Sequence, residues 1–295
     1  MKRKVTIVLS VIGVALAVAT VSVAQFRDRR WRGDDDRWAE SARHTRYGRD
    51  FPTWEIDEAF PEDVFTFVRV RYDSYYGGYG RRRGGGGWDT DFPECELNFS
   101  LRLHQVTSLK VNPDPIVLAL TDPRLFDYPF IYMIEPGSLE FREAEVAALR
   151  RYLENGGFLM VDDFWGQDEW DNFYQEIKRV FPDREPEDVD LSHPIFSCVY
   201  PMKEKPQIPS IGWARRGQLD VTYERGKWYG PNNDTDPHYR AIKDDADRIM
   251  VFICHNTDLG DGWEEESVDK WYFEEFSVKK AYPMGINIVT YALTH

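Results

Sequence analysis

The stretch Glu143–Gly166, EAEVAALRRYLENGGFLMVDDFWG, constrains the fold more than any other part of the sequence. Apolar residues recur at helical spacing through Phe141–Asn155, and a pair of glycines then ends the helix. The short apolar run Gly157–Val161 predicts a strand that is buried on both faces, as in a parallel sheet. Two carboxylates, Asp162 and Asp163, follow this strand directly. The stretch therefore predicts an α/β fold with acidic residues at the carboxyl end of a central strand.

Four further segments have the apolar, β-branched composition of strands, and helical patterns separate most of them. The predicted strands are Phe65–Tyr72, Ile116–Leu120, Phe130–Ile134 and Ile249–Cys254, and the predicted helices are one capped at Asp91 and ending near Thr107, Trp170–Phe181 and Pro283–Leu293. This alternation favours a mainly parallel sheet with helices on both faces, and so a single α/β domain over residues 51–295. In the first strand Arg69 and Arg71 alternate with apolar residues, which predicts one solvent-exposed face.

Residues 1–24 have the features of a targeting segment. Basic residues at positions 2–4 precede the uncharged run Val5–Ala24, which ends in small residues suited to cleavage before Gln25. The run is also long enough to span a bilayer, so a cleaved signal peptide and an uncleaved membrane anchor both remain open. Either alternative predicts export, to the periplasm or to the outer side of the cytoplasmic membrane. Contact with the membrane is then expected only through this N-terminal segment.

Two further segments have compositions that do not predict packed structure. Residues 25–50 are highly charged without periodicity, which predicts a disordered tether. Residues 75–88, YYGGYGRRRGGGGW, predict a glycine-rich loop, and they lack the Lys and Ser/Thr of a phosphate-binding P-loop. The formal net charge of −14 disfavours binding to a nucleic-acid backbone and suits cations or basic partners. We therefore expect no nucleic-acid partner.

Several blocks of the sequence, in order, resemble the exported bacterial family of domains of unknown function called DUF4159. They are FTFVRVRY, WDTDFPE, FDYPFIYMIEPG, GGFLMVDDFWG, SHPIF and NTDLGDGWE, and the resemblance covers about Val64–His295. It implies a flavodoxin-like, three-layer domain related to class I glutamine amidotransferases, often attached to membranes and without an established activity. Glutamine amidotransferases carry a nucleophilic cysteine at the turn after the central strand. Here Asp163 and Phe164 occupy that turn, which argues against glutamine hydrolysis.

Polar residues follow several predicted strands at the point where each strand ends. The carboxyl ends of parallel strands meet at one edge of a sheet, where α/β proteins bind their ligands. The predicted ligand-binding residues are Glu135, Asp162, Asp163, His255, Asn256 and Asp258. Two neighbouring carboxylates can separate their pKa values and act as acid and base. They can equally cap the next helix and pair with an arginine, and both interpretations remain open.

The segment His255–Glu264, HNTDLGDGWE, carries three more closely spaced oxygen donors. Asp258, Asp261 and Glu264 form a candidate metal site, because hard cations such as Ca²⁺ prefer carboxylate ligands. Their spacing does not match an EF-hand loop. The alternative is a turn in which Asx side chains bond their own backbone. No cofactor other than a divalent cation is expected.

These patterns favour a non-catalytic, exported envelope module that binds a ligand or an envelope protein at an acidic crevice. The alternative is a hydrolase, with or without a metal ion, that uses Asp163 and His255 as catalytic residues together with Asp258. No hydroxyl or thiol nucleophile is evident beside these residues, because Cys254, which precedes His255, is expected to point to the opposite face of the strand. The prediction therefore leans away from an enzyme. A purely structural subunit of a membrane-associated complex is the third alternative.

Overall fold

The computed structural model describes residues 51–56, 63–74, 87–215 and 236–295. All of them lie in one compact unit of the chain. The predicted targeting segment, the predicted tether and residues 75–86 of the glycine-rich segment lie outside the described residues. Trp88, at the end of that segment, is described and is buried. Within the described ranges, no helix is both long and apolar enough to cross a membrane.

A seven-stranded sheet in the order β3-β1-β4-β6-β9-β8-β7 forms the centre of the domain. Its strands are β1 Val68–Arg71, β3 Ile116–Ala119, β4 Phe130–Ile134, β6 Phe158–Asp162, β7 Glu187–Asp188, β8 His238–Lys243 and β9 Ile249–His255. The first five in spatial order run parallel, and β8 and β7 add an antiparallel edge. Two short strands, β2 Asp73–Ser74 and β5 Leu139–Glu140, pair separately. The prediction that five named strands share one mainly parallel sheet is confirmed.

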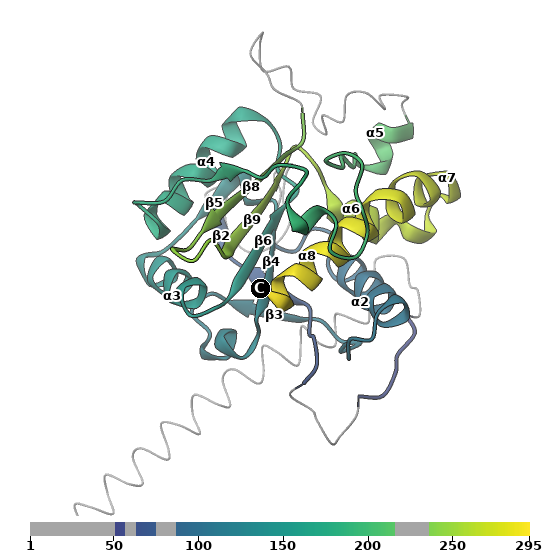
Figure 1. Ribbon diagram of the computed structural model, residues 1–295, viewed down its shortest axis with the longest axis horizontal. Coiled ribbons are helices and arrows are strands. Elements are labelled where there is room, and N and C mark those ends of the chain that lie inside the picture. The colour runs from purple at the N-terminus through teal and green to yellow at the C-terminus, as the bar shows by residue number, and fades with distance from the viewer. Residues whose placement is uncertain (1–50, 57–62, 75–86, 216–235) are drawn as a thin grey trace, which may run out of the picture. The chain divides into compact units, whose positions relative to one another are not determined.

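Helices cover both faces of this sheet (Figure 1). On one face lie α3 Glu143–Glu154 and α4 Gly166–Val180, and on the other lie α2 Glu94–Val106, α6 Leu259–Glu264 and α8 Tyr282–Thr294. The shorter segments are η1 Pro123–Asp127, η2 Pro136–Ser138, η3 Pro194–Phe196, α5 Ile211–Arg215, η4 Glu265–Ser267, α7 Lys270–Tyr272 and the π-helix η5 Phe273–Ala281. Successive residues of β4 point to opposite faces of the sheet. Phe130, Tyr132 and Ile134 share one face and belong to the same core cluster as residues of α2 and α8.

Helix α3 forms as its periodicity predicts. Val146, Leu149, Tyr152 and Leu153 are all buried, which places one apolar stripe against the sheet. The helix ends because Gly156 has a φ of 103°, a left-handed conformation that L side chains rarely adopt. The short connection then leads straight into β6. The local sequence therefore explains both the end of α3 and the start of the central strand β6.

The face of β1 that carries Arg69 is not exposed, so the prediction of a solvent-exposed face is wrong at this residue. Arg69 is 0% exposed, because β1 lies inside the sheet and α2 covers this face. Its Nε donates to Glu96 Oε1 at 2.5 Å, and its Nη1 donates to the carbonyl oxygens of Trp88 and Thr90. Burial opposes the charge, but the carboxylate of Glu96 outweighs it, and the pKa of Arg69 is raised.

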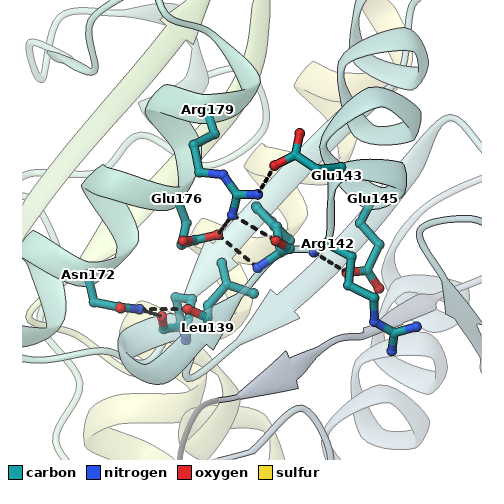
Figure 2. A network of polar contacts seen from close by, with 9 residues as sticks. Leu139, Arg142, Glu143, Glu145, Asn172, Glu176 and Arg179 are labelled. Atoms are coloured by element: carbon teal, nitrogen blue, oxygen red, sulfur yellow. Dashed lines mark hydrogen bonds and ion pairs between the residues drawn. The ribbon is translucent and has the colours of Figure 1, made fainter.

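A polar network fastens the connection between β5 and α3 to helix α4 (Figure 2). Arg179 Nη1 donates to the carbonyl oxygen of Phe141, and Glu176 Oε2 accepts from the Phe141 amide at 2.8 Å. Arg179 also pairs with Glu143 at 2.7 Å, and Asn172 donates to the carbonyl oxygen of Leu139. The network holds the chain segment that follows β4 in place against α4.

Candidate functional site

Three neighbouring strands end in the same unusual backbone conformation. Glu135 follows β4, Asp163 follows β6 and Asn256 follows β9 closely, with φ values of 49°, 54° and 58°. Asp91, which precedes α2, has a φ of 60°. Non-glycine residues in this left-handed region cost about 1–3 kcal/mol each and persist only where surrounding contacts hold them. Such strain gathers at functional sites, and here four polar residues share it.

Hydrogen bonds tie the turns after β6 and β9 to one another. The Asp163 amide donates to the carbonyl oxygen of Thr257 at 3.2 Å, and the Asn256 amide donates to that of Phe164 at 3.0 Å. The Gly166 amide donates to Asn256 Oδ1 at 2.8 Å. The predicted ligand-binding residue Asn256 therefore fixes the start of α4. The bond from the Asp163 amide to Thr257 likewise holds Asp163 in a defined position.

Five buried carboxylates converge beside these turns, and we call them the acidic cluster. They are Asp91 before α2, Asp163 after β6, Asp258 at the N-cap of α6, and Asp261 and Glu264 within α6, with exposed fractions between 2% and 8%. Ligand oxygens of Asp91, Asp163 and Asp258 all lie within 4.8 Å of one another. Those of Asp91, Asp261 and Glu264 do so as well. Asp91 belongs to both groups.

Helix α6 places three of these carboxylates by its spacing. Asp258, Asp261 and Glu264 are three residues apart, so they lie on one side of the short helix. Asp258 Oδ1 accepts from the Asp261 amide at 2.7 Å, which is the Asx-type bond of the alternative interpretation. A carboxylate has two oxygens, so a capping role and a ligand role are compatible. Asn98 Nδ2 donates to the carbonyl oxygen of Trp263 at 2.7 Å and ties α6 to α2.

Asp91 completes the cluster and was not among the predicted site residues. Just before Asp91 in the chain, the carbonyl oxygens of Trp88 and Thr90 accept hydrogen bonds from Arg69. Just after it, the Cys95 amide donates to the Asp91 carbonyl oxygen. The side chain is 6% exposed, and its Oδ2 has no hydrogen-bond partner among the described residues. Burial raises the pKa of Asp91 well above its usual range, and the negative side chains of the cluster raise it further. The sequence block WDTDFPE held this residue, but its pattern indicated only a helix start.

Asp162 lies next to the cluster and supports it. Its Oδ2 accepts from the Tyr132 hydroxyl and from the Gly260 amide, both at 3.0 Å. Burial raises the pKa of Asp162 to about 7, and these two hydrogen bonds partly oppose the rise. Asp162 therefore connects β4 and β6 to the start of α6. Neither Asp162 nor Asp163 is the N-cap of α4, which is Trp165.

His255 and Glu135 stand outside both carboxylate groups. The Nε2 of His255 lies 3.1 Å from the Gly166 carbonyl oxygen and its Nδ1 lies 3.3 Å from Arg240 Nη1. Because a carbonyl only accepts and a guanidinium only donates, Nε2 carries the proton and Nδ1 accepts. The ring also packs against Phe164 and Trp170. Glu135 lies in the turn after β4, where its carbonyl oxygen accepts from the Tyr72 hydroxyl.

A family model described as "Domain of unknown function (DUF4159)" matches residues 66–293. The chain belongs to the DUF4159 family. The match includes the five parallel strands and every residue of the acidic cluster. Comparison with curated proteins found no match.

The donor atoms at this DUF4159 site are of a kind that could hold a divalent cation. Among the described residues, eleven buried side chains are acidic, whereas Arg69 is the one buried lysine or arginine and is already paired with Glu96. Buried carboxylates are costly unless they are protonated, paired or bound to a metal ion. Oxygens within 4.8 Å of one another can share one Ca²⁺ at the usual Ca–O distance of about 2.3–2.6 Å. The donor set consists of oxygens alone, which favours Ca²⁺ or Mg²⁺ over softer metals.

Proposed function

We propose that this protein is an exported envelope module that binds a divalent cation such as Ca²⁺ in the acidic cluster. Through the cation it holds the edge of the sheet in a form that binds a ligand or an envelope protein. Asp91 is the observation that carries the proposal. It is buried, one of its oxygens has no partner among the described residues, and its carboxylate faces four others. Arg69 offsets this charge only in part, because it is paired with Glu96, and a bound cation would offset the rest.

A binding role agrees with the site better than the alternative hydrolase. All five carboxylates are at most 8% exposed, which leaves little access for a substrate. Asp163 and Asp258 converge, but His255 belongs to neither group, and both of its ring nitrogens have other partners. A general base needs to reach the proton that it removes. The arrangement therefore supports cation binding without catalysis.

Two features support the proposed relationship to class I glutamine amidotransferases. In chain order, the five parallel strands have the spatial order 2-1-3-4-5, which is typical of flavodoxin-like sheets. Asp163, with a φ of 54°, stands at a strained strand-to-helix turn, the type of turn that carries a nucleophile in related architectures. Its Oδ1 accepts from the Trp165 indole at 2.9 Å instead. In our proposal the site of a nucleophile has become part of a cation site.

The sequence supports the exported location in this proposal. A basic start and the uncharged run Val5–Ala24 precede the charged residues 25–50, and the chain as a whole is acidic. The envelope and the extracellular space supply divalent cations, and extracellular calcium modules bind with dissociation constants of about 10⁻⁴–10⁻³ M. The proposed partner is an envelope protein, with a basic surface that complements the acidic charge.

Metal analysis and thermal unfolding of the purified protein test this proposal. Saturating Ca²⁺ is expected to raise the melting temperature, because about hundredfold excess over Kd stabilises the native state by ~2.7 kcal/mol. For a domain of this size, each ~1 kcal/mol shifts Tm by about 2–4 °C. Asp258→Asn removes one ligand charge while it preserves the cap of α6, since Asn and Asp cap helices equally well. This variant should fold without metal and show a smaller Ca²⁺-dependent shift than the unmutated protein.

Glu145→Gln is the matched control, because Glu145 is buried but belongs to neither carboxylate group. It should keep the full shift. If neither Ca²⁺, Mg²⁺ nor Mn²⁺ changes the melting temperature of the unmutated protein, the proposed cation site does not exist.

A further inference from the structure

The acidic cluster divides into two groups that share a single residue. Asp163 and Asp258 form one group with Asp91, and Asp261 and Glu264 form the other. Oxygens bound to one Ca²⁺ are at most about 5 Å apart, because each lies about 2.3–2.6 Å from the ion. The five carboxylates do not meet this condition as one set, whereas each group of three does. One ion therefore does not contact all five in this arrangement.

Asp91 provides an observation that is independent of the clustering. It comes from a different part of the chain than the other four carboxylates. Arg69 fixes the backbone just before it through hydrogen bonds to the carbonyl oxygens of Trp88 and Thr90. Although Asp91 is 6% exposed, its Oδ2 has no hydrogen-bond partner among the described residues. Its carboxylate lies within ligand range of both groups at once. A carboxylate has two oxygens, so one can serve each group.

Charge favours two ions over one. When all five carboxylates are ionised they carry five negative charges, of which one divalent ion offsets two and a pair of divalent ions offsets four. Arg69 also acts on Asp91, but its guanidinium is paired with Glu96 at 2.5 Å. Close carboxylates of like charge repel one another, so a second ion adds to the effect of the first.

We infer that the cluster binds two divalent cations bridged by the carboxylate of Asp91. Asp163 and Asp258 hold the first ion, Asp261 and Glu264 hold the second, and water or further oxygen donors complete each coordination shell. Carboxylate-bridged ions of this kind lie about 3.5–4 Å apart. The inference rests on the proposed cation binding and adds to it the number of ions, their ligands and the bridging role of Asp91.

Stoichiometry tests the inference, and native mass spectrometry with Ca²⁺ on the full chain measures it directly. Two bound ions are expected for the unmutated protein and for the control Glu145→Gln. The double variant Asp261→Asn/Glu264→Gln should bind one ion, and so should Asp163→Asn. Asp91→Asn should weaken both ions by more than about tenfold, because even changes outside the ligand shell cost that much.

The outcomes separate this inference from the proposed function. One ion in the unmutated protein overturns the bridged pair and leaves cation binding intact, whereas no ion overturns both. The assignment of ligands fails if the double variant keeps two ions or loses both. Crystals of the unmutated protein soaked in Mn²⁺ need no variant to fold, and anomalous scattering should show two peaks that both contact Asp91. A single peak, or a pair that Asp91 does not contact, contradicts the inference.

Discussion

At the scale of single residues, the ion pair between Arg69 and Glu96 allows two charged side chains to be buried inside this protein. Arg69 and Glu96 are both 0% exposed and form an ion pair at 2.5 Å. The same guanidinium holds the carbonyl oxygens of Trp88 and Thr90, just before Asp91. The pair thus lets a charged strand residue lie inside the domain, and it positions the carboxylate on which the proposed function depends.

Breaking this pair should cost far more than removing it whole. Arg69→Met leaves Glu96 buried without its partner, which typically destabilises a protein by about 3–5 kcal/mol. The double variant Arg69→Met/Glu96→Met should recover most of that loss, since apolar side chains of similar size replace both charges. Urea unfolding in the presence of a chelator measures both free energies. Equal destabilisation by the single and double variants would show that the ion pair is not the dominant interaction.

At the scale of elements, the sequence accounts for those with strong local signals. Helix α3 and the five parallel strands follow from periodicity and apolar runs, and Gly156 marks the helix end. Helix α4 begins at Gly166 rather than at the predicted Trp170, because hydrogen bonds from distant residues such as Asn256 fix its start. The antiparallel strand β8 was missed because its pattern, HYRAIK, mixes charged and apolar residues. Its partner β9 stabilises it, and local sequence does not encode that pairing.

The candidate site shows the same division between local and distant signals. Asp258, Asp261 and Glu264 were predictable because they are close in sequence and evenly spaced. Asp163 was predictable because it follows a strand. Asp91 was not, because its place in the cluster depends on the packing of α2 against α6. His255 also follows a strand, yet its ring lies among Phe164, Trp170 and Arg240 rather than in the cluster.

Close packing of α6 predicts an unequal effect of two glycine substitutions. A Cβ at Gly262 would overlap with the Cβ of Ala281, whereas one at Gly212 would meet no atom within 4 Å. Gly262→Ala should therefore destabilise the protein by about 1–3 kcal/mol through overpacking. Gly212→Ala in α5 should be neutral or stabilising by up to about 1 kcal/mol. Thermal unfolding of the two variants measures the difference, and similar melting temperatures would contradict the close contact.

At the scale of the whole molecule, the acidic cluster joins three regions that are far apart in sequence. The residue before α2, the turn after β6 and helix α6 meet at the carboxyl edge of the sheet, whereas the network of Arg179 and Glu176 fastens the β5–α3 connection to α4 (Figure 2). The carboxylates repel one another without a cation, so this edge is the part that metal binding should order most. The α3–α4 layer has its own ion pairs and needs no cation to form.

Hydrogen exchange under native conditions should reveal this division. Ca²⁺ is expected to slow exchange of amides that open locally around Asp91, Asp163 and α6, because the ion links these three segments. Amides of the α3–α4 connection at Phe141 should keep their local exchange rates, since Glu176 and Arg179 hold them in either state. Asp258→Asn, measured in parallel with and without Ca²⁺, should reduce the difference. Slower exchange confined to α3 and α4, with none around the acidic cluster, would place the cation elsewhere in the molecule.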